Sequence, residues 1–227
     1  MSTDLTAFAR RRDDILGRIA AAARTAGRDP ADVSLVGVSK QQPDDRIEAA
    51  LAAGHRVFGE NRVQEAENRW QARRRDYPGL ELRLVGPLQT NKAEQAVALF
   101  DVIETLDREK LARALRKAIG KVKRTPRLYV QVNTGEEEQK SGVLPHNVAG
   151  FLDLVRDEYG FDIEGLMCIP PVGEPAGPHF ALLADLAAAN NVQKLSMGMS
   201  SDYETAVKFG ATSVRVGSAL FGERPSA

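Results

Sequence analysis

Two hydrophobic periods alternate along this chain from residue 34 onward. Short aliphatic or β-branched runs, typical of buried strands, are separated by longer stretches in which apolar residues recur every three or four positions, as on one face of a helix. This alternation is typical of parallel strands joined by crossover helices. The runs that predict strands cover residues 35–38, 56–58, 82–85, 101–104, 127–132, 163–167, 194–197 and 213–216. Helices are predicted between them, for example over residues 44–53, 60–75 and 107–117.

The start of the chain follows the helical period before any strand begins. Arginines and aspartates separate apolar residues that recur at helical spacing, namely Leu5, Phe8, Ile15, Leu16 and Ile19. We therefore expect an amphipathic N-terminal helix within residues 1–28, packed on the rest of the molecule. This segment contains no uninterrupted apolar run as long as a signal peptide core or a membrane span.

Eight repeats of strand and helix predict a single (β/α)8 TIM-like barrel, with residues 1–227 forming one domain. Such a barrel would be compact, because barrels of this kind typically span about 250 residues. The alternative is an open doubly wound sheet, which usually carries a glycine-rich phosphate turn after its first strand. Here the first strand is followed by SKQQPDD, and no glycine-rich nucleotide motif occurs in the chain. We expect the two longest loops, 133–145 and 170–178, to cover the barrel mouth.

Charge and cysteine content narrow the possible partners. Lys plus Arg and Asp plus Glu both total 31, so no net charge would draw the chain to nucleic acid or to an anionic membrane. We therefore expect a small-molecule partner and a monomer. Cys168 is the single cysteine and cannot form an internal disulfide, which fits a reducing cytoplasm. No Cys/His spacing predicts a metal site, and we expect surface or capping roles for His55, His146 and His179.

A lysine lies just after the first predicted strand. Lys40 follows the apolar run LVGVS, at the strand end that faces the active rim of a barrel. An amine between apolar walls and other cations loses proton affinity, and the neutral amine attacks an aldehyde to form an imine. The alternative is a solvated loop lysine, which is the commoner role of this residue type. Lys40 is therefore a candidate nucleophile.

Two turns rich in small residues follow the last two predicted strands. GMSSD comes after the seventh strand and VGSALFG after the eighth. Backbone N–H groups of Gly217 and Ser218, together with the hydroxyls of Ser200 and Ser201, could bind a phosphate dianion without a lysine. Barrels commonly bind phosphate between these two loops. The alternative is that Ser200 or Ser201 only caps a helix.

Two further polar residues are expected inside the barrel or at its mouth. Arg215 lies between Val214 and Val216, so strand alternation directs its side chain to the face opposite theirs. A buried guanidinium needs an acceptor, which is either a core carboxylate or a heteroaromatic ring nitrogen. Asn61, in FGEN after the second strand, either presents its amide at the mouth or caps a turn.

Seven short motifs run in order along nearly the whole chain. They are GVSK at 37–40, FGENRVQE at 58–65, GPLQTNK at 86–92, QVNTGEEEQKSG at 131–142, GLMCIPP at 165–171, LSMGMSSDYETAV at 195–207 and VRVGSALFG at 214–222. Together they resemble the pyridoxal phosphate homeostasis family, and seven motifs in order are far more specific than one short pattern. Members of that family look like the barrel domain of alanine racemase, so the resemblance implies the same barrel that the periodicity predicts.

The resemblance implies a cofactor role for each matching residue. The lysine of GVSK, here Lys40, is the family's Schiff-base residue for pyridoxal 5′-phosphate. Ser200, Gly217 and Ser218 fall on phosphate-binding positions. Arg215 falls on the residue that faces the pyridine nitrogen.

Two other positions complete the comparison of motifs. Asn61 falls on a cofactor-contacting position of the family. Many relatives have a histidine before the GPLQ motif, where this chain has Arg83, so no role of that imidazole carries over.

The function that the resemblance implies is to hold pyridoxal phosphate reversibly in the cytoplasm, without substrate turnover, with apo forms of vitamin B6 enzymes as recipients. An arginine at the ring nitrogen weakens the electron sink that carbanion chemistry uses, although alanine racemase itself works with arginine. Racemisation also needs a second acid or base, which in the racemase comes from a separate C-terminal domain of the partner subunit. This chain ends at Ala227, shortly after the last barrel motif, so we expect no such domain here.

Two other functions remain open from the sequence. One is a pyridoxal phosphate-dependent racemase or decarboxylase acting on a small amino acid, with its second base supplied by a mouth loop or another subunit. The other is an aldolase that uses Lys40 on a phosphorylated sugar without any cofactor. Proton exchange at the amino-acid Cα identifies the first, and a colourless purified protein identifies the second.

Overall fold

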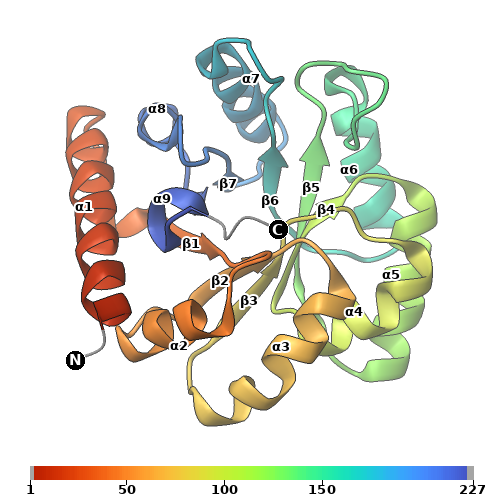
Figure 1. Cartoon of the computed structure of the whole chain (residues 1–227). Coiled ribbons are helices and arrows are strands. Elements are labelled where there is room, and N and C mark those ends of the chain that lie inside the picture. The colour runs from red at the N-terminus through yellow and green to blue at the C-terminus, as the bar shows by residue number, and fades with distance from the viewer. Residues whose placement is uncertain (1–2, 224–227) are drawn as a thin grey trace.

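The computed structural model describes residues 3–223, and its strands close into one parallel barrel (Figure 1). Neighbouring strands follow chain order, and β1 pairs in parallel with both β2 and β8. The strands are β1 Ser34–Val38, β2 Val57–Glu60, β3 Glu81–Leu84, β4 Val102–Leu106, β5 Arg127–Val132, β6 Ile163–Cys168, β7 Lys194–Ser196 and β8 Ser213–Val216. The (β/α)8 barrel predicted from the alternating periods is confirmed.

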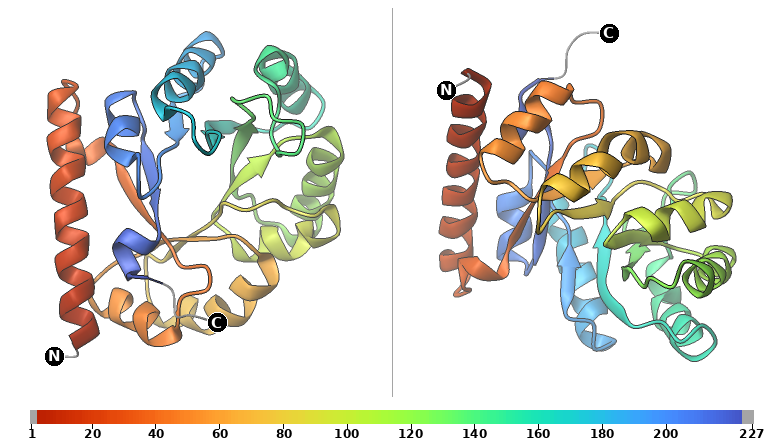
Figure 2. Two further views of the ribbon diagram at one scale, coloured as in Figure 1. Left: turned by 45° about the horizontal axis from the view of Figure 1, so that its top comes forward. Right: turned by 90° about the horizontal axis from the view of Figure 1, so that it is seen from below.

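Helices surround the barrel and connect consecutive strands (Figures 1 and 2). The α-helices are α1 Thr3–Thr25, α2 Asp44–Ala52, α3 Val63–Asp76, α4 Ala93–Leu99, α5 Glu109–Val122, α6 Val148–Asp157, α7 Ala176–Ala189, α8 Tyr203–Lys208 and α9 Ser218–Phe221. Single 3₁₀ turns cover Pro30–Asp32, Thr90–Lys92 and Pro145–Asn147. Among residues 3–223, no helix combines the length and the apolar character that crossing a membrane requires.

The second repeat differs from its predicted boundaries. The sequence predicts a helix over residues 60–75, but Glu60 is the last residue of β2, where it pairs with Leu84 and is fully buried. Helix α3 begins only at Val63. An acidic residue at this place is typical of a helix start, whereas a carboxylate is rarely buried unless it is paired. Donors from α3 supply that pairing here, and the sequence pattern gave no sign of them.

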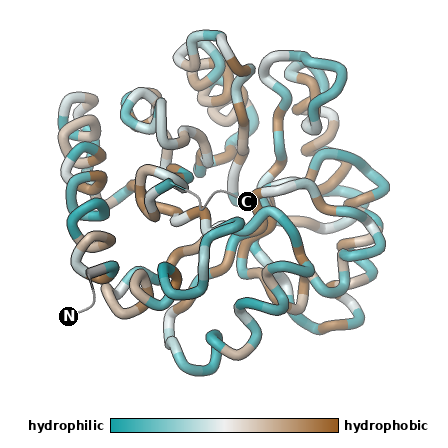
Figure 3. Tube along the Cα trace, viewed as in Figure 1, coloured by the Kyte–Doolittle hydropathy of each residue, from teal (hydrophilic) through white to brown (hydrophobic). Residues whose placement is uncertain are grey.

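The apolar core lies mainly between the barrel and its helices. In Figure 3 hydrophobic positions follow the strands and alternate with hydrophilic ones along the helices. The largest fully buried side chains include Trp70, Phe58, Phe100 and Phe180. The barrel interior is partly polar instead, because a small cluster of Val102, Tyr129 and Met167 shares it with buried Arg83, Glu104 and Arg215.

Helix α1 lies along one side of the barrel, beside α2, α8 and α9 (Figure 2). Its buried face consists of Phe8, Ile15, Ile19, Ala22 and Ala23. Leu16, which the helical pattern included in the apolar stripe, is 40% exposed because it lies off this face. The helix ends at Thr25, three residues before the predicted limit of 28, and a glycine at position 27 with φ of +68° follows it.

The loops after β5 and β6 contact each other at the barrel mouth. Lys140 Nζ donates a hydrogen bond to the carbonyl oxygen of Pro170 at 3.4 Å. A Cβ atom at Gly135 would lie 2.2 Å from the ring of Pro171, so the close approach of the two loops requires glycine there. Asn133 closes the first loop from within, because its amide donates to the carbonyl oxygen of Glu137 at 2.8 Å.

The prediction of a surface or capping role is wrong for His55. This side chain is 8% exposed and lies between the rings of Phe8 and Phe58, with centroid distances of 5.9 and 4.9 Å. Its Nε2 lies 2.8 Å from the carbonyl oxygen of Val57. Burial lowers the pKa of His55 to about 4, so the ring is neutral at pH 7. His146 is exposed, as predicted.

Candidate functional site

A cavity of about 190 Å³ opens where the barrel strands end at their carboxyl termini. In (β/α)8 barrels, residues at this rim form the active or binding site. The cavity is lined from the ends of β1, β2, β3, β6, β7 and β8, through Val38, Lys40, Gln42, Asn61, Val85, Ile169, Met199, Ser200, Arg215, Gly217 and Ser218. The closed barrel therefore brings the first and last strands of the chain to one site.

Most of the residues that the sequence singled out line this cavity. They are Lys40, Asn61, Ser200, Arg215, Gly217 and Ser218. Ser201 does not share this lining. It is exposed and lines a neighbouring groove between α1 and α8, together with Arg11 and Arg18.

The cavity has a charged floor, a rim of small residues and apolar walls. Arg215 lies within β8 and is 4% exposed, whereas Ser218 begins α9 and is exposed. The walls between them are provided by Val38, Val85, Ile169 and Met199. A flat ring with an anionic group at one end matches this distribution, because its faces meet apolar side chains and its ends meet donors.

Hydrogen bonds from both terminal nitrogens hold Arg215 in place. Nη1 donates to Ser196 Oγ at 2.7 Å, and Nη2 donates to the carbonyl oxygen of Cys168 at 2.7 Å. Among the described residues, these two bonds use two of the five N–H groups of a guanidinium, so donors remain for a ligand acceptor. The Cys168 thiol is buried, which raises its pKa to about 12 and keeps it protonated.

A buried carboxylate links Arg215 to a second arginine across the barrel. Glu104 Oε2 accepts from Ser196 Oγ at 2.5 Å and lies 4.0 Å from Arg215 Nη1. Glu104 Oε1 accepts from Arg83 Nη1 at 3.1 Å, and Arg83 Nε donates to Glu81 at 2.6 Å. Burial alone would lower the pKa of Arg83, but the carboxylates of Glu104 and Glu81 raise it above its ordinary value. The core carboxylate expected near a buried Arg215 is therefore present as the ion-pair partner Glu104, while the hydrogen bonds of Arg215 go to Ser196 and Cys168. The same arginine also lines the cavity.

The turn after β7 is shaped by a glycine and an aspartate. Gly198 has φ of +92°, and a Cβ atom there would lie 2.5 Å from the Cβ of Ala206 in α8. Asp202 Oδ1 accepts a hydrogen bond from the backbone N–H of Met199 at 2.6 Å. This closure places Ser200 in the cavity lining, opposite the first residues of α9.

Sequence reasoning missed the residues that surround Lys40. Gln42 lines the cavity two residues after the lysine, and Glu60 and Arg69 lie behind the same loop. The only available signal was Glu60 itself, whose position in FGEN was interpreted as a helix start. The contacts of Arg69 with Glu60 and with the lysine loop join separate elements, so no hydrophobic periodicity in the sequence predicts them.

The donor set of the cavity fits a phosphorylated pyridine aldehyde. It combines one amine, from Lys40, with one floor guanidinium and a rim of hydroxyl and backbone N–H groups. The first N–H groups of α9 have no carbonyl partner within the helix, so they are available to an anion. Among the described residues, no cluster of three or more His, Cys, Asp or Glu side chains could hold a metal ion.

Comparisons with known sequences agree on one family. The model of the alanine racemase N-terminal domain matches residues 14–225. The pyridoxal phosphate homeostasis protein of Pseudomonas aeruginosa is 40% identical over 92% of this chain and 93% of that protein. The protein of the same name from Escherichia coli K12 is 33% identical over 91% of this chain and 92% of its own.

Solved structures show the same barrel. PipY of Synechococcus elongatus PCC7942, solved with PLP bound, is 38% identical, covers 95% of this chain and 100% of its own, and has a TM-score of 0.80. Alanine racemase of Clostridium difficile 630 is 16% identical, covers 94% of this chain and 58% of its own, and has a TM-score of 0.65. At that identity the racemase likeness shows the fold alone.

Proposed function

The chain belongs to the pyridoxal phosphate homeostasis family, with the barrel of the alanine racemase N-terminal domain, and we propose that it holds pyridoxal 5′-phosphate as a Schiff base on Lys40. The observation that carries this proposal is the composition of one cavity. Lys40, Arg215 and the two serine-glycine turns come from opposite ends of the chain and line the same space.

Each lining residue has a distinct proposed part. The Lys40 amine condenses with the cofactor aldehyde, forming one C=N bond and releasing one water molecule. Arg215 donates a hydrogen bond to the ring nitrogen from the cavity floor. Ser200, Gly217 and Ser218 bind the phosphate at the rim. Ser201, which follows Ser200 in the same turn and lines the neighbouring groove, adds a hydroxyl from that side, and Asn61 contacts the cofactor from the end of β2.

The cavity lining also supports the proposal that the protein does not turn over a substrate. When bound, the cofactor supplies an aldehyde and an electron-withdrawing ring, which requires protein acids and bases to become catalytic. Among the described residues, Lys40 is the one candidate acid or base in this lining, because the guanidinium of Arg215 stays protonated and the other lining side chains are apolar, amide or hydroxyl groups. A two-base racemisation would need a second such group on the other face of the ring.

We further propose that the protein acts in the cytoplasm and releases its cofactor to apo-enzymes that need it. A Schiff base forms and hydrolyses reversibly, so a protein that binds through one can both store and supply the aldehyde. To test supply, the loaded protein would be mixed with an apo-aminotransferase in the presence of a scavenger of free aldehyde. Recovery of aminotransferase activity supports transfer, and no recovery beyond that obtained with free cofactor overturns it.

The Schiff base is tested by visible absorption during titration with pyridoxal 5′-phosphate. Wild type should develop the visible band of a lysine Schiff base, and Lys40→Ala should not. Lys92→Ala is the matched control, because Lys92 lines the neighbouring groove at the mouth but not this cavity. A wild-type protein without the band, or a Lys40→Ala variant that keeps it, would overturn the proposal.

The absence of turnover is tested separately, by incubating the loaded protein with small amino acids in deuterated water. Exchange at Cα should not exceed that caused by free pyridoxal phosphate at the same concentration. Exchange well above that level would replace the proposal with a racemase-like activity. Product formation from an amino acid would instead identify a decarboxylase.

A further inference from the structure

The loop that carries Lys40 has an unusual backbone. Between the end of β1 and the start of α2, Gln41 has φ of +58°, a left-handed conformation that non-glycine residues seldom adopt. Such a conformation persists only where the surrounding structure holds it. Gln42 N–H donates to the carbonyl oxygen of Ser39 at 3.1 Å, which closes the loop around the lysine.

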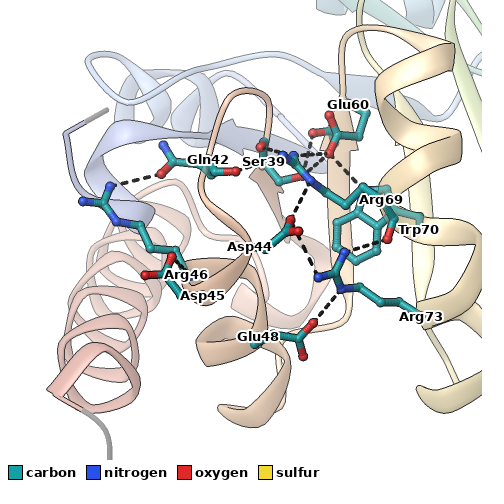
Figure 4. A network of polar contacts seen from close by, with 11 residues as sticks. Ser39, Gln42, Asp44, Asp45, Arg46, Glu48, Glu60, Arg69, Trp70 and Arg73 are labelled. Atoms are coloured by element: carbon teal, nitrogen blue, oxygen red, sulfur yellow. Dashed lines mark hydrogen bonds and ion pairs between the residues drawn. The ribbon is translucent and has the colours of Figure 1, made fainter. Parts of the chain in front are cut away.

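One arginine outside the barrel forms hydrogen bonds with both ends of this loop (Figure 4). Arg69, in α3, donates from Nη1 to the carbonyl oxygen of Ser39 at 2.7 Å and from Nη2 to that of Gln42 at 2.9 Å. The two carbonyls flank Lys40 and Gln41 in the sequence. The planar fork of a guanidinium therefore sets the spacing of the two loop ends, which a single-point donor could not do.

A fully buried carboxylate fixes the arginine and the loop together. Glu60 Oε1 accepts from Arg69 Nη1 at 3.1 Å, from Trp70 Nε1 at 2.9 Å and from Ser39 Oγ at 2.7 Å. Glu60 is 0% exposed, and these are charge-assisted or buried hydrogen bonds, which are stronger than exposed ones. Figure 4 shows Glu60 where Ser39, Arg69 and Trp70 meet.

The hydrogen bond between Ser39 and Glu60 also sets the direction of the Lys40 side chain. In extended chain, successive side chains project to opposite sides. Val38 and Lys40 line the cavity, whereas Ser39 between them is buried against Glu60, on the helix side of the sheet. A rotation of Ser39 away from Glu60 would carry Lys40 away from Arg215 and Ser218.

We propose that Glu60 and Arg69 are positioning residues that hold the loop of residues 39–42 so that the Lys40 amine lies in the cofactor cavity. This inference rests on the proposed function, because it specifies how the protein presents its Schiff-base lysine. Neither residue touches the cavity itself, so both act through the backbone and through Ser39.

A purely structural role is the competing explanation, and the chain offers a matched control for it. Arg74 lies in the same helix and binds a backbone carbonyl and a carboxylate in the same way, reaching Leu99 at 2.7 Å and Asp101 at 2.8 and 2.9 Å. Asp101 precedes β4, at the barrel end opposite the cavity. Arg74→Met should therefore remove a comparable set of bonds without touching the lysine loop.

The experiment compares Arg69→Met with Arg74→Met through two readouts. The first is hydrogen–deuterium exchange of the apo-protein at the amides of residues 40–42. The second is the dissociation constant for pyridoxal 5′-phosphate from the Schiff-base absorption. Arg69→Met should speed exchange at these amides and weaken binding by about tenfold or more, whereas Arg74→Met should change neither. Equal effects of the two variants on both readouts, or no effect of Arg69→Met, would overturn the inference.

Two further results keep the test decisive. If Arg69→Met does not fold, Ser39→Ala replaces it. This variant removes the hydroxyl, which donates to Glu60 Oε1 at 2.7 Å and lies 3.4 Å from the carbonyl oxygen of Gly59, and it leaves Arg69 in place. It should shift both readouts in the same direction by less. No shift in Ser39→Ala would overturn the inference. If wild type forms no Schiff base, the proposed function fails, whereas the exchange readout on the apo-protein still decides whether Arg69 holds the loop.

Discussion

Three buried charged side chains meet inside the barrel, and their pairing explains why an arginine can form the floor of the cavity. Arg83 and Arg215 lie on different strands, and Glu104 lies between them with no exposed surface. A buried ion pair adds little over an apolar core when intact, but removing one partner leaves an uncompensated charge in a medium of low polarity. The carboxylate is therefore needed by both guanidinium groups.

Replacing this carboxylate should be strongly destabilising. Glu104→Ala removes the carboxylate that accepts a hydrogen bond from Arg83 and pairs with Arg215 at 4.0 Å, and we expect the free energy of unfolding to fall by about 3–5 kcal/mol. Urea denaturation followed by circular dichroism measures this change. Glu94→Ala is the control, because Glu94 pairs with Lys121 while 52% of its side chain is exposed, and it should have a much smaller effect. Equal losses in the two variants would contradict this account of the interior.

His55 makes stability depend on pH in a defined window. Burial is the main cause that lowers its folded-state pKa to about 4. The hydrogen bond with the Val57 carbonyl opposes this shift and the charges of Arg12 and Arg56 add to it, whereas an unfolded histidine titrates near its ordinary value of 6.5. Between these two values the unfolded chain binds a proton that the folded protein does not. Stability should therefore fall as pH drops from 6.5 toward 4, by up to about 3 kcal/mol from this residue.

The measurement is the free energy of unfolding at pH 7 and pH 5 for wild type and for His55→Gln. Glutamine retains an N–H donor for the carbonyl of Val57 but does not titrate. The variant should lose less stability than wild type between the two pH values. Parallel losses would assign the acid sensitivity to carboxylates instead.

At the scale of elements, strand and helix positions followed from the hydrophobic pattern, whereas their ends depended on side-chain contacts. The boundaries of β5 and β8 agree with the sequence prediction, because aliphatic residues recur at every second position in both strands, at 128, 130 and 132 and at 214 and 216. The start of α3 does not, because Glu60 is stabilised in the sheet by Arg69 and Trp70. A local pattern cannot indicate a partner nine or ten residues away on another layer.

In helix α1, too, the hydrophobic period predicted the helix but not which apolar side chains are buried. Phe8 and Leu16 both fit an apolar stripe, but Phe8 is 1% exposed and contacts the ring of Phe221 at 5.4 Å, whereas Leu16 is 40% exposed. Phe8→Ala should lower the free energy of unfolding by about 3–5 kcal/mol, and Leu16→Ala by about 1 kcal/mol or less. Denaturant titration of both variants checks the difference. A similar loss in both would mean that α1 packs on a different face.

At the scale of the whole molecule, closure of the barrel is what assembles the cofactor cavity. The sequence predicted the barrel, and the rule that strand ends carry function selected Lys40 and the last two turns. It did not predict that Arg215 would share a carboxylate with Arg83, or that Arg69 would reach the lysine loop. Both depend on which strands and helices become neighbours, and short-range periodicity contains no such information.

The surface of the described part of the chain bears on its oligomeric state. Exposed large apolar residues are distributed over different elements, at Leu16 in α1, Ile169 and Val172 after β6, and Phe209 after α8. Stable dimers usually bury about 800 Å² on each partner around an apolar centre, whereas these exposed apolar residues belong to different elements. The formal net charge of zero adds no long-range repulsion or attraction between copies. We therefore predict a monomer of 24.7 kDa by light scattering coupled to size exclusion, with and without cofactor. A mass twice this value that persists on dilution would contradict the prediction and indicate that a partner copy covers part of this surface. A dimer mass that changes between the apo and the loaded protein would then indicate that the covered surface adjoins the cavity mouth.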